Sequence, residues 1–387
     1  MQSCSLDRYQ VPDDYIPPER DLHLEDIDKG DVVAVAMSGG VDSSVVAALL
    51  HEKGYKVIGI TLQLYDHGKA IQKQKACCAG QDIYDAQKVA SQIGFPHYVL
   101  NYESIFKQKV IDDFANSYVN GETPVPCIQC NQQVKFKDLL QFAKDLDAKA
   151  LVTGHYVQRT VYNKDNKKFT TLQKAIDYSK DQSYFLFGTT TEELNYLRFP
   201  LGIFDSKLET RYHAKRLHLP IANKPDSQDI CFVPDGDYRS IVSKIRPEAL
   251  HPGDIVDMNG KVLGKHQGII NYTIGQRKGL GISAPEPLYV IKIDPTYHHV
   301  VVGPKEDLAK KIIYLKDMNW LVSVKVGEIL SCQIKIRSSG LEMPATVYVL
   351  DKNMAEIHLY EPEYGISRGQ AGVLYDDNIV LGGGWII

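Results

Sequence analysis

One stretch near the N-terminus constrains the fold more than any other part of the chain. Residues 32–37 form an apolar run typical of a β-strand, residues 38–43 read Ser-Gly-Gly-Val-Asp-Ser, and residues 44–50 are apolar and typical of a helix. A buried strand that ends in two glycines lets the backbone come close to a ligand. The helix that follows directs its unpaired N–H groups and the positive end of its dipole toward an anion. The stretch therefore predicts a phosphate site, in which the hydroxyls of Ser38 and Ser43 can donate to phosphate oxygens.

The glycine turn differs from the two commonest phosphate loops. No Lys follows the glycines, and the G-x-G-x-x-G dinucleotide fingerprint is absent. A plain strand-to-helix turn that only needs glycine is the simplest alternative. The whole hexapeptide, with a strand before it and a helix after it, resembles the loop of the pyrophosphatase-type (PP-loop) ATP enzymes. That resemblance implies cleavage of ATP between its α and β phosphates and transfer of AMP to a carbonyl or carboxylate oxygen, and it leaves the acceptor open.

Strand-like and helix-like segments alternate after this loop and predict an α/β domain with a doubly wound parallel sheet. The expected strands are 32–37, 56–63, 97–100 and 149–153, and the expected helices are 41–53, 81–93, 104–119 and 132–146. Residues 121–130 are expected to form a Pro-rich loop. Ligands collect at the carboxyl ends of such strands. There Leu62 can offer an apolar face to adenine and Gly154 a close backbone approach, although both residues also suit a core.

The pattern changes downstream of residue 154. Residues 158–173 predict a polar hairpin, and residues 190–221 are helix-like with a basic run (207–218). Such a run is typical of a solvated helix face, and contacts with nucleic-acid phosphates are the alternative. Short β segments separated by turns then fit a small antiparallel barrel. We expect four parts, namely an acidic extension (1–30), a phosphate-binding catalytic domain (31–217), a small central domain (218–286) and a C-terminal barrel (287–387).

Composition limits the class of protein. A chain of 387 residues exceeds the size at which one core keeps growing, so two or three domains are expected. Seven cysteines, an odd number, argue against the disulfide framework of a secreted protein. We expect a cytoplasmic protein with no membrane contact, because no apolar run could span a bilayer and no signal-peptide pattern is present. Residues 1–30 hold eight acids and three bases, so the body is near neutral and a nucleic-acid site would be a local patch.

Two groups of cysteines suggest sulfur chemistry. Cys127 and Cys130 form a Cys-x-x-Cys pair just before an expected helix, where the helix dipole favours the nucleophilic thiolate. Such a pair is also half of a zinc site, but Cys77 and Cys78, the only candidates for the other half, lack its usual spacing, so structural zinc is an alternative that is not favoured. Cys231 lies downstream among carboxylates and hydroxyls, and it gains interest only because a second thiol pair and an ATP loop share the chain.

Several motifs in chain order resemble the bacterial tRNA-specific 2-thiouridylases. They are Ala-Met-Ser-Gly-Gly-Val-Asp-Ser (36–43), Cys-Asn-Gln-Gln-Val-Lys-Phe (130–136), Thr-Gly-His-Tyr (153–156), Lys-Asp-Gln-Ser-Tyr-Phe-Leu (180–186), Asp-Ser-Gln-Asp-Ile-Cys-Phe-Val (226–233), Tyr-Thr-Ile-Gly-Gln-Arg-Lys-Gly-Leu (272–280) and Val-Leu-Gly-Gly-Gly (380–384). The resemblance runs from about residue 31 to the end of the chain and makes residues 218–286 a tRNA-binding linker domain.

The resemblance also implies roles for individual residues. The implied ATP-binding residues are Ala36, Met37, Ser38, Gly39, Gly40, Val41, Asp42, Ser43, Leu62 and Gly154. The implied tRNA-binding residues are Val125, Pro126, Cys127, Lys180, Asp181, Gln182, Arg337 and Ser338. Cys130 would be the nucleophile, Cys231 would carry a persulfide, and Cys127 is a candidate auxiliary thiol. Some members of that family carry Asn-Pro-Asp where this chain has Val125-Pro126-Cys127, and relatives carry Arg-Tyr where it has Arg337-Ser338. An acid/base carboxylate and a stacking ring are therefore missing here.

The implied reaction is ATP-dependent adenylation of C2 of the wobble uridine in tRNA for Lys, Glu and Gln, followed by sulfur transfer to give 2-thiouridine. ATP is required and Mg²⁺ is expected, and a cysteine desulfurase or a sulfur carrier would supply the sulfur. One alternative keeps the reaction but places an iron–sulfur cluster on Cys127, Cys130 and Cys231. Two others are a different PP-loop synthetase acting on a small carboxylate and a non-catalytic tRNA-binding protein.

Overall fold

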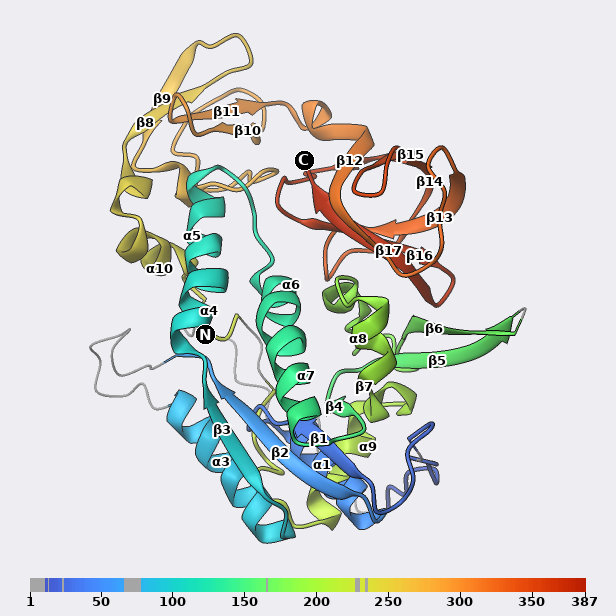
Figure 1. Ribbon diagram of the computed structural model, residues 1–387. Helices are drawn as coiled ribbons and strands as arrows, with labels where there is room; N and C mark the ends of the chain where they lie inside the picture. The colour runs from blue at the N-terminus through green and yellow to red at the C-terminus, as the bar shows by residue number, and fades with distance from the viewer. Residues whose placement is uncertain are drawn as a thin grey trace. The chain divides into compact units, whose positions relative to one another are not determined.

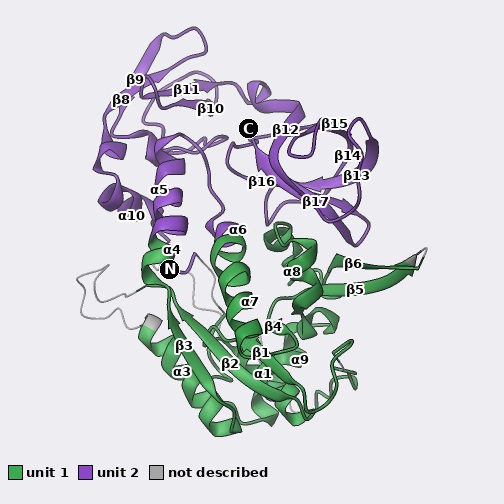
Figure 2. Cartoon of the chain, viewed as in Figure 1, with its two compact units in different colours: residues 1–107, 130–228 green, residues 108–129, 229–387 purple. Residues whose placement is uncertain are grey.

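The computed structural model describes residues 11–387 except 13, 23, 66–77, 165, 227–229 and 234–235 (Figure 1), and of residues 78, 79 and 164 it describes the backbone alone. The chain divides into two compact units (Figure 2). The first consists of Met1–Lys107 and Cys130–Gln228, and the second of Gln108–Gln129 and Asp229–Ile387.

The first unit is built on a five-stranded parallel sheet with the order β3-β2-β1-β4-β7. Its strands are β1 Val32–Ala36, β2 Lys56–Gln63, β3 His97–Asn101, β4 Leu151–Thr153 and β7 Leu197–Arg198. β1 is central, and its residues Val33, Ala34 and Val35 are fully buried, as expected for a strand covered on both faces. The prediction of a doubly wound parallel sheet is confirmed.

Helices flank this sheet, and three of its strands end side by side. The helices of the first unit are α1 Val41–Glu52, α3 Cys78–Ile93, α4 Glu103–Phe106, α7 Phe136–Asp145, α8 Thr191–Tyr196 and α9 Lys207–Arg216, with 3₁₀ turns at Ser183–Leu186 and Pro200–Ile203. α1, α3 and α9 share one hydrophobic core, whereas α7 packs against β1 outside that core. A polar hairpin, β5 Val157–Lys164 and β6 Lys167–Lys174, lies where it was expected. Because β2, β1 and β4 are neighbours, their carboxyl ends share one edge.

Two expected helices contain a π-helical turn. Residues 103–119 form α4, a π-helix at Lys107–Ile111 and then α5 Asp112–Val119. Residues 126–145 form α6 Pro126–Cys130, a π-helix at Asn131–Lys135 and then α7. The expected loop at 121–130 is therefore wrong over its second half. The physical reason is that Pro occupies the first position of a helix well, since its φ is preset and its missing N–H would be unpaired there.

The second unit holds two further sheets. α10 Tyr238–Ile245 and 3₁₀ turns at Pro247–Leu250, Ile269–Asn271 and Lys305–Leu308 accompany them. One sheet has the order β10-β11-β8-β9 and comprises β8 Gly253–Val256, β9 Val262–His266, β10 Tyr289–Asp294 and β11 His299–Gly303. The other comprises β12 Ala309–Trp320, β13 Ile329–Lys335, β14 Met343–Val349, β15 Ala355–Tyr364, β16 Ala371–Asp376 and β17 Ile379–Ile386. Antiparallel pairing of β12 with β17 closes it, so the predicted barrel is confirmed. No helix in the described parts of the chain is long and apolar enough to cross a membrane.

The segment before β1 is part of the first unit's core. Leu22, Leu24 and Ile27 are buried in the same cluster as α1, and the backbone N–H of Leu24 donates to the Tyr55 hydroxyl at 2.9 Å. Arg20 makes a two-bond ion pair with Glu209 on α9. This part of the acidic extension therefore wraps the domain and is fixed to it, while residues 1–10 lie outside the described chain.

We expect Leu24→Ala to lower the free energy of unfolding of the first unit by about 2–4 kcal/mol, because it leaves a cavity in that core. Ile16 is 83% exposed in the same segment, so Ile16→Ala is the matched control and should change it by less than about 0.5 kcal/mol. Denaturant unfolding followed by helical circular dichroism reports on the first unit, where most helices lie. Equal effects of the two substitutions would contradict the packed position of Leu24.

Candidate nucleotide site and cysteine residues

The loop between β1 and α1 is an open anion cradle. The N–H of Ser38 donates to Ser43 Oγ at 3.1 Å, and Gly40 at the start of α1 provides no side-chain cap. The N–H groups of the first helical turn are therefore available to a ligand. Gly39 has a φ of +73°, and a Cβ there would lie 2.2 Å from the backbone oxygen of Asp82 on α3. Glycine is thus required at residue 39 both by backbone conformation and by the approach of α3.

The two other strand ends complete this edge. Gly154 follows β4, and a Cβ on it would lie 2.7 Å from the backbone nitrogen of Ser43. Leu62 near the end of β2 is half-buried, and the neighbouring Thr61 donates to the Met37 carbonyl at 2.9 Å. The structure thus brings the predicted ATP-binding residues of β1, β2 and β4 to adjacent strand ends. That they bind ATP stays a prediction.

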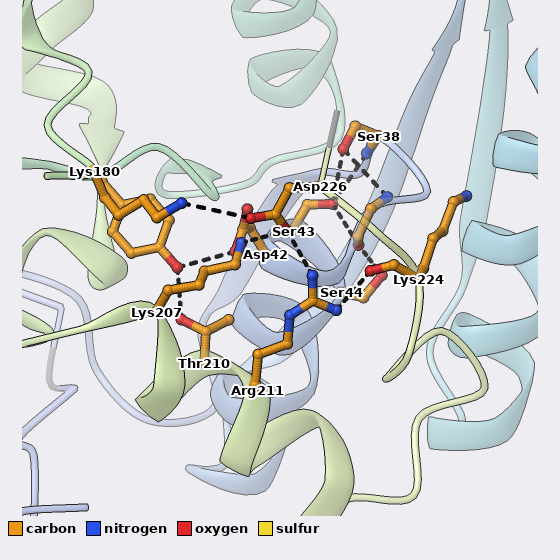
Figure 3. A network of polar contacts seen from close by, with 12 residues as sticks. Ser38, Asp42, Ser43, Ser44, Lys180, Lys207, Thr210, Arg211, Lys224 and Asp226 are labelled. Atoms are coloured by element: carbon orange, nitrogen blue, oxygen red, sulfur yellow. Dashed lines mark hydrogen bonds and ion pairs between the residues drawn. The ribbon is translucent and has the colours of Figure 1, made fainter. Parts of the chain in front are cut away.

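Asp42 in the first turn of α1 is the centre of a polar network (Figure 3). Its carboxylate accepts hydrogen bonds from the Tyr156 hydroxyl at 3.0 Å and from the Lys207 ammonium. Lys207 also lies 3.1 Å from Asp226, and its side chain is only 3% exposed. Burial followed by the nearby Asp42 raises the pKa of Tyr156 well above its usual value, so its hydroxyl remains a donor.

Asp226 gathers three cations. Its carboxylate pairs with Lys207, with Arg211 at 2.6 Å and with Lys180 at 3.7 Å. Burial opposes ionisation of Asp226, but these cations, Lys207 foremost, hold its pKa below the usual value. The expectation of a solvated basic face is wrong for Lys207 and Arg211, which are buried. The sequence shows the charge of these two residues. It does not show which carboxylates, far away along the chain, pair with them.

The predicted tRNA-binding residues differ in their surroundings. Asp181 accepts hydrogen bonds from the N–H of Ala175 and the hydroxyl of Ser183, and Gln182 Oε1 accepts from the N–H of Tyr156. In the second unit, Arg337 donates to the carbonyls of Tyr364 and Gly365 at 2.8 Å each. Val125 is half-buried, Pro126 is buried, and Ser338 is exposed. Asp181, Gln182 and Arg337 thus bond to nearby backbone, and contact of the whole set with tRNA stays a prediction.

The four cysteines whose side chains are described differ in burial. Cys130 is 5% exposed where α6 passes into the π-helix, whereas Cys127 is exposed in the first turn of α6. Cys231 is exposed beside buried Phe232, whose ring packs edge-on against Phe114 at 5.2 Å. Burial raises the pKa of the Cys332 thiol to about 12 and so makes it inert. Cys4 and Cys77 lie outside the described residues, as does the side chain of Cys78.

Gly154→Ala should weaken ATP binding by about tenfold, or ~1.4 kcal/mol, because its methyl group would displace the first turn of α1. Titration calorimetry with a non-hydrolysable ATP analogue measures this affinity. Gly80→Ala on α3 is the control, since its Cβ would meet nothing within 4 Å. Unchanged affinity in a folded Gly154→Ala protein would remove Gly154 from the nucleotide site.

His155 gives a pH dependence with a defined sign. Burial, and then the charge of Lys135, lower its pKa to about 3, and its Nδ1 lies 2.8 Å from Thr153 Oγ1. In the unfolded chain the ring gains a proton below about pH 6.5, so stability should fall between about pH 6.5 and pH 3. His155→Gln should make this fall less steep in pH-dependent denaturant unfolding. An unchanged slope would contradict a neutral His155.

The chain matches the family models described as tRNA methyl transferase HUP domain (residues 31–235), tRNA methyl transferase PRC-barrel domain (239–304) and Aminomethyltransferase beta-barrel domain (310–386). A U34-tRNA thiolase NcsA from Methanococcus maripaludis, solved with its 4Fe-4S cluster, matches at 16% identity with a TM-score of 0.36, covering 59% of this chain and 68% of that one.

Two curated relatives match nearly the whole chain. The tRNA-specific 2-thiouridylase MnmA of Paracoccus denitrificans (strain Pd 1222) is 56% identical over 357 residues, which cover 92% of this chain and 91% of the relative. That of Orientia tsutsugamushi (strain Boryong) is 56% identical over 366 residues, which cover 94% and 98%. Identity of this extent shows that the chain belongs to the family of tRNA-specific 2-thiouridylases.

Proposed function

We propose that this protein is an ATP-dependent sulfurtransferase that converts the wobble uridine of tRNA for Lys, Glu and Gln to 2-thiouridine. The observation that carries the proposal is the open Ser38–Ser43 loop at three adjacent strand ends, in a chain 56% identical to named tRNA 2-thiouridylases. Because tRNA is the proposed substrate, the cytoplasm is the expected location.

The first half-reaction activates a poor leaving group. The C2 oxygen of uridine attacks the α-phosphorus of ATP, the bond from that phosphorus to the bridging oxygen breaks, and pyrophosphate leaves. Residues 36–43 are proposed to hold the departing pyrophosphate through backbone N–H groups and serine hydroxyls, with Leu62 and Gly154 at the adenosine. A cradle of preorganised donors stabilises the charge that develops there.

Mg²⁺ fits the chemistry of this loop. The ion prefers oxygen ligands and is commonly bound by one or two carboxylates together with substrate phosphates. Asp42 offers such a carboxylate in the first turn of α1, and its side chain is 33% exposed. Asp42 would hold the ion, which would neutralise charge on the pyrophosphate.

The second half-reaction replaces oxygen by sulfur. A cysteine desulfurase or a sulfur carrier passes a sulfur atom to the Cys231 thiolate, giving a persulfide. The Cys130 thiolate attacks the Cys231 sulfur, the S–S bond of the persulfide breaks, and hydrosulfide is released as a Cys130–Cys231 disulfide forms. Hydrosulfide attacks C2, and AMP leaves with the former oxygen. In the variant in which the persulfide attacks C2 directly, Cys130 then releases the product, and the same disulfide forms.

A thiol reductant must return two electrons and two protons to that disulfide before the next turnover. The target base must leave its stack to reach any such site. Residues 125–127, residues 180–182, Arg337 and Ser338 are proposed to contact the tRNA, and residues 218–286 to link the catalytic domain to the barrel at 287–387.

An iron–sulfur route is the alternative with the same product. The persulfide route needs only two thiols and a reductant, so it is the one we propose. Cys127 is then an auxiliary thiol rather than a required ligand.

The test is incorporation of ³⁵S from cysteine, through a cysteine desulfurase, into unmodified tRNA. Wild type should incorporate label only with ATP, and Cys130→Ser and Cys231→Ser should fall to background, because each removes one partner of the disulfide. Cys332→Ser is the matched control, since this half-buried barrel cysteine should leave incorporation unchanged. Nucleoside mass analysis distinguishes oxygen-to-sulfur replacement from methylation.

Two other outcomes of this test would favour an alternative function or mechanism. A brown preparation whose colour and activity both disappear in Cys127→Ser would replace the persulfide route by the cluster route. ATP cleavage without label in any tRNA would refute the proposed acceptor.

A further inference from the structure

Two cations fix the chain that leads to Cys231, one to α9 and the other to the nucleotide loop and α3. Arg211 on α9 donates to the carbonyls of Ala222 at 3.0 Å and Lys224 at 2.6 Å, and to the carboxylate of Asp226 at 2.6 Å. All three acceptors belong to residues 222–226, here named the leader segment. Arg211 is 6% exposed, so these bonds are sheltered from water.

The leader segment is bonded to the loop itself through Lys224. The Lys224 ammonium donates to the carbonyl of Gly39 at 3.0 Å, and Asp82 and Asp85 on α3 accept from it at 2.7 and 2.6 Å. Its contact with Gly39 reaches the same glycine turn that is proposed to cradle the phosphate. The leader segment is therefore held from α9 on one side and from α3 and the loop on the other.

Covalent geometry makes this attachment relevant to the thiol. Cys231 follows Asp226 by five residues, and five residues of fully extended chain span at most about 18 Å. Fixing Asp226 thus limits how far Cys231 can move from the point of attachment. Without the attachment of Asp226, the Cys231 thiol would explore a larger volume, and its effective concentration at an activated base would fall.

We propose that Arg211 is a positioning residue for sulfur transfer, which, with Lys224, holds the leader segment so that the Cys231 persulfide is presented to the adenylated uridine. The inference rests on the proposed function and deepens it. Arg211 acts through the backbone that carries Cys231, whereas Asp42 and Lys207 belong to the adenylation half-reaction. The two half-reactions should therefore respond differently to loss of Arg211.

The experiment measures both half-reactions in the full chain. tRNA-dependent ATP–pyrophosphate exchange reports adenylation, and ³⁵S incorporation reports the whole reaction. In Arg211→Met, exchange should stay within about threefold of wild type while incorporation falls about 10- to 100-fold, the range expected from misplacing a reacting group. Arg211→Lys should fall between, because one ammonium cannot replace a planar fork of donors. This variant keeps the charge and serves if Arg211→Met fails to fold.

A chemical rescue distinguishes positioning from a structural role. Millimolar sodium sulfide supplies hydrosulfide, which can attack an adenylated C2 without Cys231. Sodium sulfide should restore thiolation in Arg211→Met as well as in Cys231→Ser. Mass analysis of the tRNA nucleosides measures the 2-thiouridine formed. Rescue of Cys231→Ser but not of folded Arg211→Met would show that Arg211 serves adenylation and would overturn the proposal.

Arg216→Met is the matched control. Arg216 lies on the same helix and makes a two-bond ion pair with Glu52, and none of the bonds described for it reaches the leader segment. It should keep both half-reactions. Equal loss of incorporation in Arg216→Met and Arg211→Met would reduce the effect to the stability of α9 and refute positioning. If wild type itself forms no 2-thiouridine, the proposed function fails first, an outcome distinct from failure of Arg211 alone.

Discussion

The ligand edge of the first unit depends on one buried ammonium. Lys207 is 3% exposed and lies between the carboxylates of Asp42 and Asp226. Desolvating a charge costs several kcal/mol, and only close partners of opposite charge offset that cost. The three residues come from the nucleotide loop, from α9 and from the leader segment. Their pairing is thus a condition for these three segments to pack together around the open N-terminus of α1.

This arrangement is relevant to the proposed phosphate loop, which has no lysine of its own. In loops that carry a Lys after the glycines, the cation reaches the β and γ phosphates from within the motif. Here cations from elsewhere in the chain lie around the loop, namely Lys207 at Asp42 and Lys224 at the Gly39 carbonyl. The backbone N–H groups are left to the ligand, while the cations fix the carboxylate and the turn. This separation of roles between backbone donors and side-chain cations suits the proposed reaction, in which pyrophosphate departs as one unit.

The sequence predicted what local pattern determines. The strand expected at 56–63 is β2, the loop at 38–43 joins β1 to α1, and the closing β segments form a barrel. Each of these follows from period, turn chemistry or glycine placement within a few residues. The solvated basic face failed for Lys207 and Arg211, because a carboxylate far away in sequence decides whether a cation is buried. The same holds for Leu24, whose burial depends on α1 rather than on its acidic neighbours.

The local chain geometry also distinguishes Cys127 from Cys130, which their spacing in the sequence did not. The Cys-x-x-Cys pair was expected in one loop, but α6 begins at Pro126, so the two side chains have different surroundings. Cys127 is exposed at the helix start, and Cys130 is buried where α6 turns into a π-helix. π-Helical turns cost backbone regularity and recur at functional sites. Cys231 has an exposed thiol, whereas its neighbours Phe232 and Val233 are buried. The proposed role of Cys231 needs an external sulfur donor to reach the thiol, and its exposure meets that need, whereas buried Cys130 is proposed to react only with the chain's own persulfide.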